Sequence, residues 1–187
     1  MTAQELIKKL FSETEERITI CKDEIAKLNI DALLYKENEA EWNALECLDH
    51  LHHYAHYYHP LIEEKLKNTS ISADEHFNET WLGKQFMKIF DDKKAKKYKA
   101  MPRMKPHTAE LKKEFVQRFI DEQTFFLELL KMAKKTSLQK NKVPLEFCKL
   151  ISVSFGDIFQ FLSAHDNRHL LQALKVSRKY SLVKKIT

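Results

Sequence analysis

Two histidines near the C-terminal end of the chain could bind a metal ion together. His165 and His169 lie four residues apart in a segment with helical periodicity, so their imidazoles rise from the same face of one helix, one turn apart. Imidazoles spaced in this way are common ligands of divalent ions. The pair therefore indicates metal chemistry.

The pair belongs to an apolar stripe, which predicts that both side chains point into the protein. The stripe advances by alternating steps of four and three residues, the pattern of a helix that faces a bundle core. Its members are Ile151, Phe155, Ile158, Leu162, His165, His169, Gln172 and Val176. Because Asp166 and Gln172 lie close to the histidines, either side chain could orient an imidazole.

The elements that must position this pair are helices. Apolar residues recur at helical spacing in four long segments, and almost no segment alternates like a strand. We expect helices at about residues 3–28, 39–66 and 107–136, and a fourth that begins at Pro144. Pro60 should kink or end the second helix.

A long connection separates the second helix from the third. It spans about 40 residues, 67–106, which is too long for a tight turn and predicts a crossover with a short helix around Thr80–Phe90. No repeat or domain boundary interrupts the chain. The sequence therefore predicts one all-α domain over residues 1–187.

Composition is typical of a soluble protein with one core. A chain of 187 residues can bury roughly 70 per cent of its unfolded surface. It lacks a run of about 18 apolar residues, and its start resembles no signal peptide. Its three cysteines are widely separated and suggest no disulfide framework. We expect a cytoplasmic protein without membrane association.

Much of the positive charge falls in one segment. The net charge is +5, from 32 basic and 27 acidic residues, and Lys93–Lys105 holds a large share of the excess. Such a segment can bind nucleic acid or anions, but it is more often a solvated loop. We therefore do not expect a nucleic-acid partner.

A third metal ligand is expected from the second helix, because two histidines hold a divalent ion poorly. At about 100° per residue, His50 lies at the edge of the arc formed by the apolar residues of this helix and is the best candidate. The others, His52, His53, His56 and His59, fall outside that arc and should lie on a solvated face. Trp42 does not fit the arc.

Two further residues have a simple structural interpretation. Cys47 lies one turn before His50 and could supply a sulfur ligand, but a buried packing cysteine is the commoner case. Glu122 interrupts the apolar stripe of the third helix and is expected at the surface. We do not assign it as a catalytic base.

Two segments resemble the metal-ligand motifs of the DinB-like superfamily. The first is Trp42–Leu51, followed by Tyr57–Pro60, and the second is Phe155–Ala173. The similarity covers nearly the whole chain in order and spacing, including Trp81–Gly83 and the lysine-rich passage that ends at Pro106. Together the two motifs are specific for this family.

The resemblance implies a fold and a ligand set. It implies a four-helix bundle in down-up-up-down order, with a divalent metal held by His50, His165 and His169. Relatives include transferases that use bacillithiol or mycothiol, a mycothiol-dependent isomerase, and proteins described as metal-dependent hydrolases. Dimers are common in the family, so we expect a homodimer.

Three histidines without a fourth protein ligand are typical of a catalytic metal site. An open position can lower the pKa of a bound water or thiol. The leading hypothesis is transfer of a low-molecular-weight thiol to a small electrophile. The alternatives are hydrolysis of a small substrate and a non-catalytic metal-binding or stress-related bundle. Imidazoles suit zinc, nickel, iron or copper, so the metal is not identified.

Overall fold

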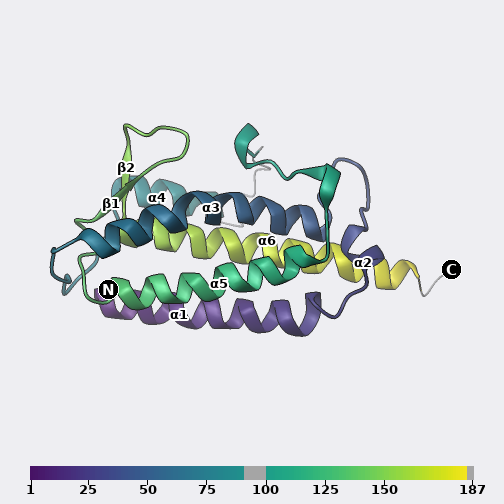
Figure 1. Ribbon diagram of the computed structural model, residues 1–187, viewed down its shortest axis with the longest axis horizontal. Helices are drawn as coiled ribbons and strands as arrows, with labels where there is room; N and C mark the ends of the chain where they lie inside the picture. Colours follow the sequence, from purple (N-terminus) through teal and green to yellow (C-terminus); the bar gives the residue numbers. More distant parts are fainter. Residues whose placement is uncertain (91–99, 185–187) are drawn as a thin grey trace.

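The computed structural model describes residues 1–90 and 100–184. Four long helices lie side by side in it (Figure 1). They are α1 (Ala3–Ile20), α3 (Ala44–Asn68), α5 (Glu114–Ala133) and α6 (Phe155–Val183). Both α1 and α3 pack against α5 and α6. The protein is mostly helical, and the predicted all-α class is confirmed apart from one small hairpin.

Short elements connect the long helices. The helical turns are a π-helix (Cys21–Ile25), α2 (Ile30–Leu34), α4 (Trp81–Met87) and the 3-10 turns Lys88–Phe90, Pro102–Met104 and Thr108–Glu110. The strands are β1 (Lys142–Pro144) and β2 (Ser152–Ser154), which pair antiparallel with Val143 opposite Val153. The short helix expected around Thr80–Phe90 is confirmed as α4 with its following turn.

The predicted start of the last helix is wrong. Pro144 ends strand β1, and α6 begins instead at Phe155. Ser154 caps the helix, since its hydroxyl accepts a hydrogen bond from the backbone N–H of Asp157 at 3.3 Å. Ile151 therefore lies outside the helix and is 44% exposed, so it is not part of the buried stripe.

Two other helix starts also come later than expected. Asn43 caps α3, and its side chain accepts from the backbone N–H of Glu46 at 2.8 Å, so the helix begins at Ala44 rather than near 39. A 3-10 turn precedes α5, which starts at Glu114 rather than at 107. Helix α3 continues through Pro60 to its end, so the proline does not end it.

A layer of polar side chains divides the core into two apolar clusters. In α6, one cluster extends to Leu162 and the other resumes at Leu170, and in α1 the same gap lies between Leu10 and Ile18. The buried polar residues in these gaps and at the same level of α3 and α5 are Thr14, Arg17, His50, Gln123, Ser163, His165 and Asp166. Two of the predicted histidine ligands, His50 and His165, therefore lie in a buried polar layer, and the partly buried His169 lies in the same gap of α6.

Both glycines of the chain allow close packing at the start of α6. A Cβ atom on Gly83 would lie 2.0 Å from Oδ1 of Asp157, and one on Gly156 would lie 2.2 Å from the ring of Phe77. Glycine lets α4 approach α6 this closely. The 3-10 turn Lys88–Phe90 follows α4 directly.

Residues 93–99 of the lysine-rich segment lie outside the described residues. Of its remainder, Arg103 lies 3.9 Å from the carboxylate of Glu146, and Lys105 is exposed. Among the described residues, none of the helices combines the length and the apolar character needed to cross a membrane.

Candidate metal centre

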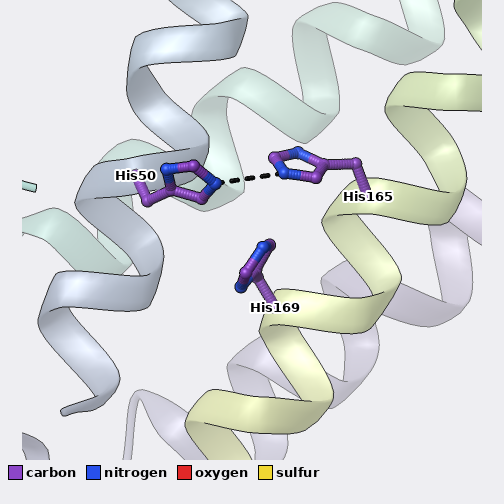
Figure 2. Close-up of side chains that lie close together, drawn as sticks. All are labelled: His50, His165 and His169. Carbon is purple, nitrogen blue, oxygen red and sulfur yellow. Dashed lines mark hydrogen bonds between the residues drawn. The ribbon is translucent and has the colours of Figure 1, made fainter. Parts of the chain in front are cut away.

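Three histidines from two helices meet in the polar layer. Figure 2 shows His50 on α3 facing His165 and His169 on α6. The three ring centroids lie 4.9 Å (His50–His165), 4.6 Å (His50–His169) and 4.7 Å (His165–His169) apart. The Nε2 atoms of His50 and His165 are separated by 3.1 Å. The structure thus brings together all three residues that were predicted from the sequence as metal ligands.

Hydrogen bonds fix the orientation of two of these rings. Nδ1 of His50 donates to the backbone carbonyl of Met104, and Nδ1 of His169 donates to Oε1 of Gln172 at 3.0 Å. Because a carbonyl oxygen can only accept, each Nδ1 carries the proton and each Nε2 presents a lone pair. Both rings therefore point an Nε2 lone pair, which can bind a metal, into the space between the three histidines.

The third ring is buried without this support. Nδ1 of His165 is buried and has no hydrogen-bond partner in the described part of the chain. The ring stacks on Phe161, with centroids 5.5 Å apart and planes inclined by 9°. Its Nε2 lies 3.1 Å from the Nε2 of His50, and since His50 presents a lone pair there, the Nε2–H of His165 donates to it. A cation that took the place of this proton would be bound by both nitrogens.

All three imidazoles are neutral at pH 7. Burial lowers the pKa of His50 to about 4 and that of His169 to about 3. Burial also lowers the pKa of His165 well below its ordinary value, and the neighbouring His169 and His50 act in the same direction. Because a metal competes with protons for its ligands, neutral imidazoles favour its binding.

A cavity of about 540 Å³ opens onto the three histidines. Its aromatic lining residues are Trp42, Tyr54, Phe90 and Phe161, and its charged ones are Glu37, Glu41, Arg168, Lys175 and Lys179. The Trp42 ring lies 4.8 Å from that of His50 and 5.7 Å from that of His169. Trp42, which the helical pattern of the sequence did not explain, therefore covers the site from just before the α3 cap.

Comparison with protein families identifies the chain. Residues 23–173 match the model of the DinB superfamily. The chain belongs to the DinB superfamily. The matched range contains all three histidines of the cluster, which could hold a metal ion, and DinB-like proteins commonly bind divalent metals. No curated protein and no solved structure matches the chain.

In this member of the DinB superfamily, a buried arginine lies in the polar layer beside the histidines. Nε of Arg17 donates to Oε1 of Gln123 at 2.9 Å, and its two terminal nitrogens donate to Ser163 at 2.9 Å and to Thr14 at 2.8 Å. These bonds join α1, α5 and α6. Arg17 was not predicted from the sequence, because a charged side chain is rarely buried without partners from other segments.

The two residues expected to orient an imidazole have different roles. Gln172 accepts from His169, as expected. Asp166 instead accepts from Nε2 of Gln123 at 2.7 Å and so belongs to the arginine network. Burial raises the pKa of Asp166 to about 6, against the opposing effect of Arg17.

The other histidines of α3 do not all lie on a solvated face. His56 is exposed, while His52 is partly buried and pairs with Glu122. The prediction is wrong for His59, which is 6% exposed and stacks on Phe126 with centroids 5.7 Å apart. Burial lowers the pKa of His59 to about 4. It lies just outside the predicted apolar arc, but α3 packs against both α5 and α6 and so buries a wider face than that arc.

Cys47 packs in the core, as expected. The side chain is fully buried, and burial raises the pKa of its thiol, so it does not provide a thiolate at neutral pH. It is not part of the histidine cluster that could hold a metal.

Proposed function

We propose that this protein is a metal-dependent enzyme that transfers a low-molecular-weight thiol to a small electrophile. The observation that carries this proposal is the convergence of three neutral imidazoles at a cavity of about 540 Å³, a size suited to small molecules. A divalent ion held by three imidazoles supplies an open position that lowers the pKa of a thiol or a water.

The chain's own residues would hold the ion and exclude water from it. His50, His165 and His169 are the proposed ligands, and the carbonyl of Met104 and the amide of Gln172 orient two of them. The aromatic rings beside the histidines bind apolar parts of a substrate. Such rings also keep the nucleophile from bulk solvent, which strengthens electrostatic interactions at the site.

The position of Glu37 favours thiol transfer over hydrolysis. Glu37 lines the cavity and pairs with Lys179. At 1.5 Å per residue, Lys179 lies roughly 15 Å beyond His169 along α6, so this ion pair holds the carboxylate of Glu37 away from the proposed metal. Hydrolysis of an ester or amide needs a nearby group that moves protons, whereas a thiolate attacks without one.

In the proposed reaction, a sulfur–carbon bond forms as the bond between that carbon and its leaving group breaks. The thiol proton is lost to solvent before the attack, and the leaving group departs with the electron pair. Arg168 and Lys175 lie on the cavity wall and would attract anionic parts of either reactant. The guanidinium of Arg168 also donates to the carbonyl of Ile89 at 2.9 Å, which holds the aromatic wall in place.

The finer features implied by the family belong to the same proposal. We expect a four-helix bundle in down-up-up-down order, and the colour gradients in Figure 1 support it, since α1 and α6 run one way and α3 and α5 the other. We also expect a homodimer in the cytoplasm, with zinc, nickel or iron as the metal. Light scattering on the purified protein tests the oligomeric state.

The experiment is a conjugation assay with monochlorobimane. Protein purified without a tag is stripped, reloaded with zinc, nickel or iron, and mixed with bacillithiol, mycothiol, glutathione or cysteine. We expect metal-dependent formation of the fluorescent adduct with at least one thiol. His165→Ala should abolish it, while His56→Ala, which alters an exposed histidine on α3, should not.

Two other outcomes would redirect the proposal. Release of product from a panel of small esters and amides, dependent on metal and on His165, would identify a hydrolase. Absence of both activities from protein that binds its metal fully would contradict the enzymatic function and favour a non-catalytic bundle.

A further inference from the structure

A second cluster of metal-ligating side chains lies on another face of α3. Asp49 and His53 are one turn apart on this helix, and His107 comes from the connection that leads into α5. Oδ2 of Asp49 lies 3.4 Å from Nε2 of His53 and 3.7 Å from Nδ1 of His107. The three donor atoms lie within 4.8 Å of one another, as do those of the histidine triad.

These separations match the ligand spacing of a small divalent ion. With bonds of about 2.1 Å, tetrahedral ligands of zinc lie about 3.4 Å apart. The rings of His53 and His107 are 4.7 Å apart, which lies within the 4.6 Å to 4.9 Å of the triad. Two imidazoles and one carboxylate form a common zinc ligand set.

The buried nitrogen of His53 adds independent support. Nε2 of His53 has no hydrogen-bond partner in the described part of the chain, although a carboxylate oxygen lies 3.4 Å away. A donor atom that faces a carboxylate at this distance without hydrogen-bond geometry suits a shared cation better than an N–H···O bond.

The carboxylate of Asp49 is already held in place. Arg118 donates to Oδ1 at 2.7 Å, and the backbone N–H of His107 donates to Oδ2 at 2.8 Å. An ionised oxygen accepts two bonds, so Oδ2 keeps one lone pair for a cation. The charge of Arg118 opposes a second positive ion, and the side chain of His107 is 78% exposed, so binding here should be weaker than at the triad.

We infer that Asp49, His53 and His107 form a second, weaker divalent-cation site that clamps the segment 100–107 onto α3. This segment contributes Ala100 and Met101 to the cavity wall and supplies the Met104 carbonyl that orients His50. Occupation of the second site would thus order one wall of the first. The inference does not depend on thiol transfer, because it concerns metal binding at other residues.

The test is a zinc titration of metal-stripped, untagged protein by calorimetry. The wild type should bind two equivalents, the second at least tenfold more weakly. His107→Gln and His53→Gln should lose the weak equivalent and keep the tight one. His50→Ala should lose the tight one and keep the weak one. The matched control, His56→Gln, changes an exposed histidine on the same helix and should keep both.

Hydrogen exchange tests the clamp itself. Filling the weak site should slow exchange of the His107 amide, which donates to Asp49, at least tenfold in the wild type and not in His53→Gln. The inference is overturned by a single equivalent in the wild type, by a weak equivalent that survives His107→Gln, or by unchanged exchange at His107. If every variant kept the tight equivalent, the histidine triad would be contradicted, while the second site would still be supported.

Discussion

Two groups of buried polar side chains share one layer of the core, and they differ in how their hydrogen bonds are satisfied. In the arginine network, all three guanidinium nitrogens of Arg17 donate to side-chain oxygens. In the histidine triad, Nδ1 of His165 has no partner in the described part of the chain. His165 and Asp166 are adjacent on α6, yet they belong to different groups.

Because of this difference, one group contributes to stability and the other to binding. A fully satisfied buried network joins helices and fixes their rotation, and here it holds α6 with its histidines turned toward α3. Buried polar atoms left unpaired cost free energy, and here the unpaired nitrogen belongs to a ring that faces two other imidazoles. The arginine network therefore supports the fold, and the triad is built for a ligand.

The largest expected effect concerns zinc and His165. In a His107→Gln background, which removes the second cluster, zinc at about 1,000 times its Kd should raise the free energy of unfolding by about 4 kcal/mol. His165→Leu should abolish this gain. Without metal it should leave stability unchanged or raise it by up to about 1 kcal/mol, because it removes an unpaired nitrogen. Urea unfolding with and without zinc measures both. If zinc still raised the free energy of unfolding of the His165→Leu variant, the assignment of zinc binding to the triad would be contradicted.

The arginine network should respond in the opposite way. Arg17→Met leaves Asp166 buried without the nearby cation and should lower the free energy of unfolding by about 3 kcal/mol, with or without zinc. Arg178→Met, which alters an exposed pair with Glu24, should cost less than about 1 kcal/mol. Similar losses in the two urea curves would show that burial of Arg17 contributes no special stability.

The two groups should also differ in acid. Burial lowers the pKa of His50 from 6.5 to about 4, so its contribution to stability is present above pH 6.5 and is lost as the pH falls toward 4. Burial raises the pKa of Asp166 from 3.8 to about 6, so its contribution is present below pH 3.8 and is lost as the pH rises through 6.

Variants of the metal-stripped protein separate these contributions. Between pH 7 and pH 4.5, His50→Gln should reduce the loss of stability in acid, and Asp166→Asn should increase it, each by on the order of 2 kcal/mol. Urea unfolding at the two pH values provides the measurement. Changes of the same sign in the two variants would contradict the assignment.

The smallest expected effect concerns the orientation of one ligand. Gln172→Leu removes the acceptor of the His169 Nδ1–H and should weaken zinc binding at the triad about tenfold. Because Gln172 is only partly buried, the metal-free stability should stay within about 0.5 kcal/mol of the wild type. Competition with a zinc indicator measures the affinity, and an unchanged Kd would show that Gln172 does not support the ligand.

The part of the site that could be predicted from sequence depends on local periodicity. The spacing of His165 and His169 places them on one helix face whatever the rest of the fold, and the position of His50 at the edge of an apolar arc is also a local property. The stripe itself was predicted because it advances at helical spacing. Figure 2 shows the three side chains meeting.

The features that were missed depend on contacts between distant segments. The run from Val143 to Ile151 is apolar enough for a helix, but it forms the end of β1 and the loop that leads to β2, and Ser154 starts α6 only after it. Arg17 has a charged side chain, which is typical of an exposed residue. Its burial depends on Gln123 and Ser163, which other helices bring to it. Trp42 likewise gains its role from rings on α3 and α6.

The central claim is that His50, His165 and His169 bind one metal ion, and metal content tests it most directly. Wild-type protein, purified without a tag or metal column and desalted, should contain about one tightly held equivalent by mass spectrometry. This equivalent should vanish in both His50→Ala and His165→Ala and persist in His56→Ala. Metal that survives in either triad variant, or a wild type that retains none after loading with zinc, nickel or iron, would contradict the claim.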